Sequence, residues 1–216
     1  LNEKYKRFEE AVKYYNESNF LYKQFQEENP DNLVYKREYA SSFLKLGTVF
    51  TKLGQIDNAI ICFQNNNNLT KEITDLKPGN EYAQNDYANS FYKLGEAFML
   101  NNESNNALIC FNNTSILLGE LLKIYPKNLD YVSNIGLATM KMGEVHRKKE
   151  EYKEALQYYI DSNSIFEELC KNDLQNNTTK NFLAESFLNI GLIYQLSKQF
   201  EISKKCFTDY HNISME

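Results

Sequence analysis

Few side chains in this sequence are of the types that catalyse reactions or hold metal ions. There are two histidines, His146 and His211, and no phosphate-binding glycine loop, metal-ligand spacing or nucleophile motif accompanies them. His146 shares its sequence register with aromatic residues, which predicts a packing role, and His211 lies near the C-terminus without an evident partner. The adjacent carboxylates Glu150 and Glu151 are expected on a solvated helix surface. We therefore expect no enzymatic activity, no cofactor and no metal.

The four cysteines are expected to be reduced. Cys62, Cys110 and Cys206 are separated by multiples of 48 residues, and Cys170 lies outside that register. Equivalent positions in stacked helices lie about 10 Å apart, whereas a disulfide requires Cα atoms within about 7 Å. Small apolar core thiols are typical of a cytoplasmic protein, so a cytoplasmic location is expected.

A row of basic side chains is the most distinctive charged feature. Lys45, Lys93 and Lys141 recur every 48 residues, and Asn189 takes the fourth place. Such a row could bind an acidic peptide or a terminal carboxylate. Alternatively, Lys93 pairs with Glu96, and Lys141 with Glu144, at helical spacing and only keeps the surface soluble. The sequence leaves both interpretations open.

These residues are positioned by an internal repeat of 48 residues. All three prolines follow this period, and so do four of the eight glycines. Self-similarity at such a period is typical of repeat architectures, in which each repeat buries its core against its neighbours. We expect one array over 1–216, with a partial repeat over 1–30 and repeats over 31–78, 79–126, 127–174 and 175–216. The residues that mark the period are Pro30, Pro78, Pro126, Gly47, Gly95, Gly143 and Gly191.

Each repeat is predicted to contain two helices, because its apolar residues recur at steps of three and four. Asn32 and its equivalents two residues after each proline position are expected to cap the first helix. Gly54 or Asn102 would close the turn in a left-handed conformation, and Glu150 and Lys198, which replace them, should close theirs differently. The expected helices span 3–28, 32–53, 56–76, 80–101, 104–124, 128–148, 152–172, 176–197 and 199–214.

The repeat resembles the tetratricopeptide repeat. The first complete repeat contains Phe43, Leu46-Gly47, Phe50, Ala59 and Phe63, and the second repeats this pattern with Phe91, Leu94-Gly95, Phe98, Ala107 and Phe111. The resemblance covers nearly the whole chain and implies an all-α solenoid of antiparallel helix pairs with a right-handed superhelix. HEAT repeats are the closest rival by period alone, but the spacing from Gly to Ala favours the tetratricopeptide repeat.

The difference from the 34-residue form is two heptads, one for each helix. Leu69, Ile73 and Leu76 are expected to form the added apolar stripe of the second helix, and Tyr35 with Tyr39 that of the first. The resemblance further implies a binding surface on the concave face made by the first helices. There it places Ser41, Leu44 and the following site residues: Arg37, Lys45, Lys52, Asn89, Tyr92, Lys93, Glu96, Lys141, Glu144, Arg147 and Asn189.

Composition limits the partners that such a surface could bind. A net charge of −5 and a pI near 5.3 argue against nucleic acid, and no apolar run of membrane-spanning length is evident. Two functions remain open: a scaffold that binds a protein or peptide in its groove, or a regulatory arm that contacts other domains of a longer signalling protein. Because the sequence starts at Leu1, we expect it to be a fragment of a longer chain.

Overall fold

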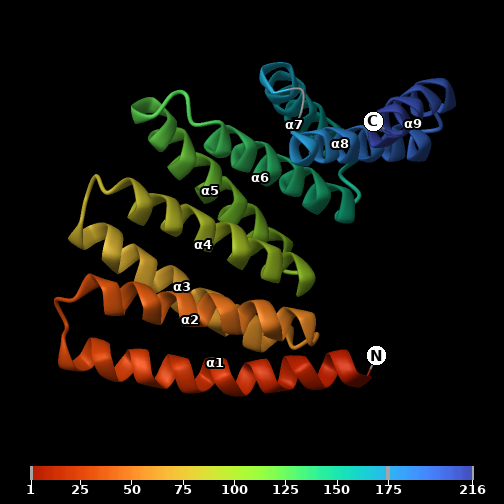
Figure 1. The fold of residues 1–216 in the computed structure, drawn as a ribbon. Helices are drawn as coiled ribbons and strands as arrows, with labels where there is room; N and C mark the ends of the chain where they lie inside the picture. The colour runs from red at the N-terminus through yellow and green to blue at the C-terminus, as the bar shows by residue number, and fades with distance from the viewer. Residues whose placement is uncertain (1, 174–175, 216) are drawn as a thin grey trace. The chain divides into compact units, whose positions relative to one another are not determined.

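The computed structural model describes residues 2–173 and 176–215, and within these residues the chain forms nine α-helices (Figure 1). No helix boundary differs from its expected position by more than one residue. The helices are α1 (Asn2–Glu28), α2 (Leu33–Lys52), α3 (Ile56–Leu76), α4 (Glu81–Leu100), α5 (Ser104–Ile124), α6 (Leu129–Lys148), α7 (Tyr152–Asn172), α8 (Asn177–Leu196) and α9 (Phe200–Met215).

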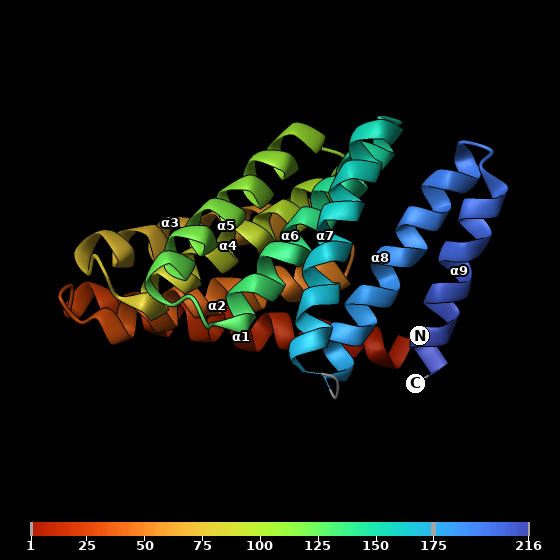
Figure 2. The ribbon, with the colours of Figure 1, turned by 90° about the horizontal axis from the view of Figure 1, so that it is seen from above.

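The chain divides into two compact units, which we call unit 1 (Leu1–Cys110) and unit 2 (Phe111–Glu216). Within unit 1, α1 packs against α2, α2 against α3 and α3 against α4. Within unit 2, the same succession joins α6, α7, α8 and α9, and the last pair lies side by side in Figure 2. Each unit is thus built from sequential helix packing, and α5 crosses the boundary between them.

The asparagine that follows each proline position caps the next first-type helix, as predicted. The Asn32 side chain accepts a hydrogen bond from the Val34 N–H at 3.0 Å, and Asn80 accepts one from the Ala83 N–H at 2.9 Å. The equivalent residues Asn128 and Asn176 cap α6 and α8 in the same way. The cap side chain satisfies a backbone donor that the first turn of a helix leaves unpaired.

The turns inside the repeats all close alike, which corrects the expectation for two of them. Gly54, Asn102, Glu150 and Lys198 all have φ between 60° and 73°. In each turn, the residue after this position donates its N–H to the carbonyl five residues earlier, for example Gln55 to Phe50 at 2.9 Å. This is the Schellman arrangement. Glu150 and Lys198 were expected to close differently because this conformation favours glycine and asparagine, but the paired hydrogen bonds hold them in the left-handed region.

The glycine column brings the two helices of a repeat into close contact, as its spacing predicts. A Cβ at Gly47 would lie 2.7 Å from the Phe63 ring, and one at Gly191 would lie 2.7 Å from Phe207. At Gly143 the nearest atom is in the Tyr159 ring, at 2.9 Å. The first-type helices α2, α6 and α8 therefore each lie against an aromatic side chain four residues beyond the small-residue column, at a distance that a larger residue could not accept.

The added heptad of the second helix is buried along a different stripe from the predicted one. Ile73 is buried, but Leu69 is only half-buried and Leu76 is 56% exposed. Thr70 occupies the interior position instead, one helical turn before Thr74. The prediction followed the leucine and isoleucine residues. The buried face instead turns gradually around the helix, so that Thr70 lies on it in place of Leu69. On the first helix, Tyr35 and Tyr39 are half-buried.

A hydrogen bond that the sequence analysis did not identify recurs between neighbouring repeats. Asn19 donates to the hydroxyl of Ser42 at 2.8 Å, and Asn67 donates to that of Ser90 at the same distance. In unit 2, Asn163 donates to Ser186 at 2.9 Å. Each bond joins a second-type helix to the next first-type helix across 23 residues of sequence. These asparagines and serines also keep the 48-residue register, which is the signal that would have revealed them.

Helix α5 is the one described helix that is long and apolar enough to cross a membrane by length and composition alone. The sequence analysis expected no such run. A third of its most apolar stretch is buried in the protein. Ala107, Phe111 and Leu118 on α5 have no exposed surface. These apolar residues of α5 therefore belong to the buried core of the protein.

Candidate functional site

A pocket of about 380 Å3 lies in unit 1, on the face formed by the first-type helices α2 and α4. We call it the α2/α4 pocket. Side chains from α2 and α4 form its walls, and α3 contributes its floor. Its lining residues are Arg37, Ala40, Ser41, Leu44, Asn66, Thr70, Asp86, Asn89, Ser90, Tyr92 and Lys93.

The structure brings several of the predicted surface residues together in this pocket. Arg37, Ser41 and Leu44 come from α2, and Asn89, Tyr92 and Lys93 come from α4. They meet because their positions on the two helices are related by the 48-residue period. The remaining predicted residues of unit 1, which are Lys45, Lys52 and Glu96, lie outside the pocket lining.

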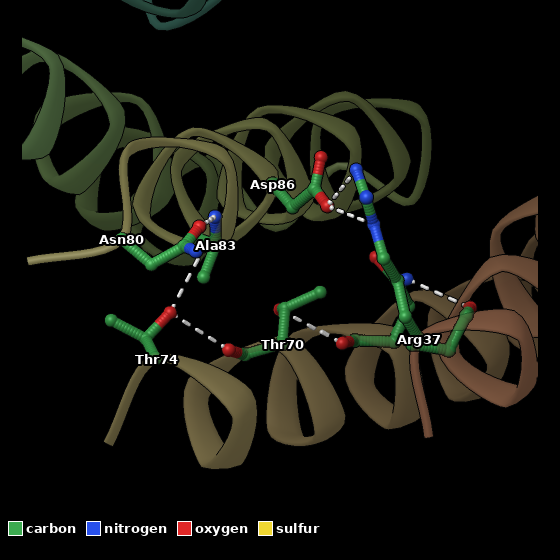
Figure 3. A network of polar contacts seen from close by, with 8 residues as sticks. Arg37, Thr70, Thr74, Asn80, Ala83 and Asp86 are labelled. Carbon is green, nitrogen blue, oxygen red and sulfur yellow. Dashed lines mark hydrogen bonds and ion pairs between the residues drawn. The ribbon is translucent and has the colours of Figure 1, made fainter. Parts of the chain in front are cut away.

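An ion pair joins the two helices at the pocket. The Arg37 guanidinium donates from Nε and Nη2 to the Asp86 carboxylate at 2.9 Å, across 49 residues of sequence (Figure 3). The Arg37 and Asp86 side chains keep 57% and 36% of their surface exposed. A pair so open to water contributes little to stability, so its main effect is to fix charges of both signs beside the opening.

The pocket floor is held by hydrogen bonds within unit 1. The Thr70 hydroxyl lies within hydrogen-bond distance of the Asn66 carbonyl, at 2.9 Å, and of the Ser90 hydroxyl, at 3.1 Å. One turn further along α3, the Thr74 hydroxyl lies 2.9 Å from the Thr70 carbonyl and 3.1 Å from that of Ala83 (Figure 3). These contacts tie the second half of α3 to the first turn of α4, so both helices support the floor.

Asn66 is the most buried amide of the pocket lining. Its side chain is on α3, is 4% exposed and donates from Nδ2 to the Ala40 carbonyl of α2 at 2.8 Å. This bond fixes the orientation of the amide, because a carbonyl accepts only from the nitrogen side. Among the residues that the structure describes, none donates to the Asn66 Oδ1 atom, which is thus an unused acceptor in the floor.

The corresponding place in unit 2 is filled by aromatic side chains. Thr70 and Asp86 have Phe166 and Phe182 as their equivalents 96 residues later, and the two phenyl rings lie 5.5 Å apart. Ala40 is replaced by Gly136, where an added Cβ would meet the Phe166 ring at 2.9 Å. Phe166 has no exposed surface. The α2/α4 pocket therefore exists because unit 1 has small and polar residues in columns that unit 2 fills.

The lysine row forms ion pairs at two of its three positions. Lys93 lies 2.8 Å from Glu96, and Lys141 lies 3.0 Å from Glu144. Lys93 also lies over the Tyr92 ring, 5.6 Å from its centroid. Lys45 is exposed. The sequence left two interpretations open. These contacts favour the one in which glutamates on the same helices neutralise most of the lysine row.

The other predicted residues lie apart from the pocket. Lys52 lies 5.6 Å from the centroid of the Phe8 ring of α1. In unit 2, Asn189 is half-buried on α8, and Arg147 is half-buried at the end of α6. Arg147 lies near the buried Tyr159 hydroxyl, but the two groups form no hydrogen bond of regular geometry. Burial raises the pKa of Tyr159 to about 12, and the proximity of Arg147 opposes this rise through weak hydrogen bonding and through its charge.

His146 packs as predicted, and it also forms a polar contact that was not predicted. Its ring stacks on Tyr158 at 5.1 Å between centroids, and its Nδ1 lies 2.6 Å from the Glu151 carboxylate. Glu151 also pairs with Lys149 at 2.7 Å. The Glu151 side chain remains partly exposed to solvent, as expected, and its pKa is lowered by hydrogen bonds from Lys149 and His146.

The cysteines are free thiols, and three of them are buried. Burial raises the pKa of Cys62 to about 11 and that of Cys110 to about 12, so neither is activated as a nucleophile. Over residues 2–173 and 176–215, no group of three or more histidine, cysteine, aspartate and glutamate side chains is arranged to hold a metal ion. The chemistry available in the α2/α4 pocket is hydrogen bonding, apolar contact and charge.

Comparisons with known proteins bear on the fold. No protein-family model matches the sequence, and no curated protein matches it. Solved structures do match. A crystal structure of MamA has a TM-score of 0.57 at 17% sequence identity, with 93% of this chain and 89% of that chain covered. A putative kinesin light chain from Podosopora anserina with nearly identical TPR-like repeats has a TM-score of 0.61 at 11% identity, with 99% and 94% covered.

The apo form of RapI is similar over a part of its length. Its TM-score is 0.64 at 13% identity, and the match covers 95% of this chain and 52% of that chain. At these identities the likeness shows the fold alone. The chain is thus an all-α, tetratricopeptide-like solenoid of sequentially packed helices, as expected from the sequence. Proteins with this fold are typically interaction scaffolds and usually lack catalytic activity.

Proposed function

We propose that this chain is a protein-interaction module, built from an extended 48-residue variant of the tetratricopeptide repeat, that binds a peptide segment on the α2 and α4 face of unit 1. The observation that carries this proposal is the α2/α4 pocket and its absence from the equivalent place in unit 2. A structural repeat would be expected to fill its own interior, as Phe166 and Phe182 do. An unfilled position between two first-type helices is a place for a side chain from another molecule.

The proposed partner is a protein or peptide. The pocket combines apolar walls with amide and hydroxyl groups and one ion pair, a mixture typical of peptide recognition. The chain's net negative charge does not favour nucleic acid. A cytoplasmic location, where cysteines remain reduced, is part of the proposal. The predicted residues Lys45, Lys52 and Glu96 of unit 1 are proposed to make only flanking contacts, and Lys141, Glu144, Arg147 and Asn189, which belong to unit 2, have no part in this proposal.

The proposal is tested by selecting ligands from a random 12-residue peptide library displayed on phage, with the 216-residue chain as bait. Affinities of the selected peptides are then measured by fluorescence anisotropy for the wild type and for Asn89→Arg. Asn89 is exposed on the pocket wall, so the larger side chain should block the opening without affecting the fold. We expect binding to weaken at least tenfold, roughly the effect of losing a central contact.

Asn112→Arg is the matched control, because Asn112 is an exposed asparagine in the second-type helix α5. This variant should bind the selected peptides as the wild type does. The proposal fails if the library gives no peptide whose affinity depends on position 89, or if both variants weaken binding equally.

The second candidate function is that of a regulatory arm in a larger signalling protein. The observation that favours it is the match to RapI, which covers 95% of this chain but only 52% of that longer chain. In that case, the α2 and α4 face would bind a segment of an attached domain. Cross-linking mass spectrometry on the full-length protein would then place that domain against α2 and α4, and cross-links confined to other helices would contradict it.

A further inference from the structure

We propose that the α2/α4 pocket binds one aromatic side chain with a hydrogen-bond donor at its tip, the chemistry of tyrosine or tryptophan. The inference rests on the proposed function and names the kind of residue that the partner would insert. Four features of the pocket support it: its size, its walls, the unused acceptor in its floor, and the way unit 2 fills the same place.

The pocket has the capacity for an aromatic ring. A dry apolar cavity of about 150 Å3 accepts benzene, and the pocket volume is about 380 Å3. A phenol or indole group therefore fits with part of its backbone in the opening. A small aliphatic side chain would leave much of this volume unfilled, and contacts across an empty gap are lost.

The walls suit the faces of a flat ring. Ala40 and Leu44 line one side from α2, and the Tyr92 ring lines the other from α4. Aromatic pairs in offset or edge-to-face arrangements gain about 0.5–1.5 kcal/mol beyond their buried area. The polar groups nearest the opening, Ser41 and Asn89, are placed to meet the backbone of the peptide that carries the ring.

The floor selects for a donor at the end of that ring. Because Asn66 Nδ2 is committed to the Ala40 carbonyl, its Oδ1 atom can only accept. A purely apolar guest would cover this acceptor and leave it without a partner, which is unfavourable. A phenolic O–H or an indole N–H would satisfy it.

Charged guests suit the pocket less well. A carboxylate tip has no proton to give to Asn66 Oδ1. A lysine tip would lose its hydration in a pocket where the Asp86 carboxylate is already bound to Arg37 at 2.9 Å. A neutral donor on an aromatic ring avoids both penalties.

Unit 2 supplies an internal example of an aromatic ring in this place. The end of the Phe166 ring lies against Gly136, the equivalent of Ala40, and Ser162 replaces Asn66. The bound ring would thus take in unit 1 the position that the chain's own phenylalanine takes in unit 2. In unit 2, where the ring belongs to Phe166 and has no polar tip, the amide acceptor is absent as well, because Ser162 replaces Asn66.

The experiment uses small probes in place of the unidentified partner. The 15N-labelled chain is titrated with p-cresol and with 3-methylindole, which carry the side-chain chemistry of tyrosine and tryptophan. Their methylated counterparts, 4-methylanisole and 1,3-dimethylindole, lack the donor but keep the ring. We expect saturable amide shifts around Ala40, Asn66 and Asn89, and weaker binding of the methylated probes by at least about fivefold. The two donor probes distinguish tyrosine from tryptophan as the preferred guest.

Two variants, the first of them copied from unit 2, test the mechanism. In Ala40→Gly with Thr70→Phe, which we call the filled variant, a phenyl ring occupies the pocket and all probes should stop binding. In Asn66→Leu, which is close in size but has no acceptor atom, p-cresol should lose its advantage over 4-methylanisole. This ratio is measured within one variant, so it remains decisive even if the filled variant does not fold.

The inference is overturned if methylated and donor probes bind the wild type equally, or if the probes shift the same amides in the filled variant. Failure of the proposed function would look different. Selected peptides whose affinity depends on Asn89 but which contain no tyrosine or tryptophan would support binding at the α2/α4 pocket and refute the aromatic guest. Probes that bind as expected, together with a library that yields no peptide, would refute the proposed function alone.

Discussion

At the scale of single residues, the contact between Gly143 and Tyr159 provides a test of how the helix pairs pack. An added Cβ would lie 2.9 Å from the buried Tyr159 ring and 3.2 Å from the Ala155 carbonyl. Gly143→Ala should therefore lower the free energy of unfolding by about 1–3 kcal/mol through overpacking, measured by urea denaturation. The matched control is Gly119→Ala, because nothing lies within 4 Å of its added Cβ. That change should raise stability by roughly 0.4–1 kcal/mol, and equal effects of the two would contradict the packing described here.

The buried Tyr159 hydroxyl predicts a loss of stability at high pH. Burial raises the pKa of Tyr159 from 10.0 to about 12, and it raises the pKa values of Cys62 and Cys110 from 9.0 to about 11 and about 12. Because the unfolded chain releases these protons first, this part of the stability is complete below about pH 9 and declines as pH rises to about 12. Tyr159→Phe should fold at least as stably at neutral pH, since its hydroxyl has no hydrogen-bond partner. Urea denaturation between pH 7 and 11 should show a shallower alkaline decline for this variant, and an unchanged decline would argue against a buried hydroxyl.

At the scale of elements, the turns that end α6 and α8 hold residues with a Cβ in the left-handed region. Lys198 has φ of 60° where the first repeat has Gly54. A left-handed conformation costs an ordinary residue about 1–2 kcal/mol, so Lys198→Gly should raise the melting temperature despite the extra entropy of the unfolded glycine chain. The reverse change, Gly54→Ala, should lower it. Opposite signs would mean that the Schellman turns do not form at these positions.

The helices and their caps could be predicted from the sequence because each boundary is marked by a residue with a local conformational preference. Asn32 and its equivalents cap helices through their own side chains, and Pro78 or Gly54 limits the backbone directly. The turn at Glu150 was mispredicted because the hydrogen bonds of the Schellman motif overrode the preference of the residue. Leu76 was mispredicted because burial depends on how the helix is rotated against its neighbours.

At the scale of the whole molecule, the repeats are similar in backbone and different in what fills the space between them. Comparing the columns of Thr70 with Phe166 and of Asp86 with Phe182 would have pointed to an unfilled place in unit 1. The pocket itself could not be predicted, since its volume depends on the packing of α2, α3 and α4. The orientation of Asn66, which creates the unused acceptor, depends on a contact with the backbone of another helix.

Sequential packing also predicts how far a local change spreads. In solenoids each repeat contacts only its neighbours, so disturbances stay local. Asn163→Ala removes the 2.9 Å hydrogen bond from α7 to Ser186 of α8, at a cost of roughly 0.5–1.5 kcal/mol. Hydrogen exchange should accelerate in α7 and α8 and stay unchanged in α1 and α2. Equal acceleration in α1 and α2 would mean that the chain unfolds as one cooperative body.

The most direct test of the α2/α4 pocket as a binding site is isothermal titration of the strongest selected peptide into the wild type, Asn112→Arg and the filled variant. We expect the wild type and Asn112→Arg to bind with similar affinity, and the filled variant to lose at least tenfold, the typical effect of removing a central anchor. A filled variant that folds and binds the peptide as tightly as the wild type would show that the ligand lies elsewhere on the molecule.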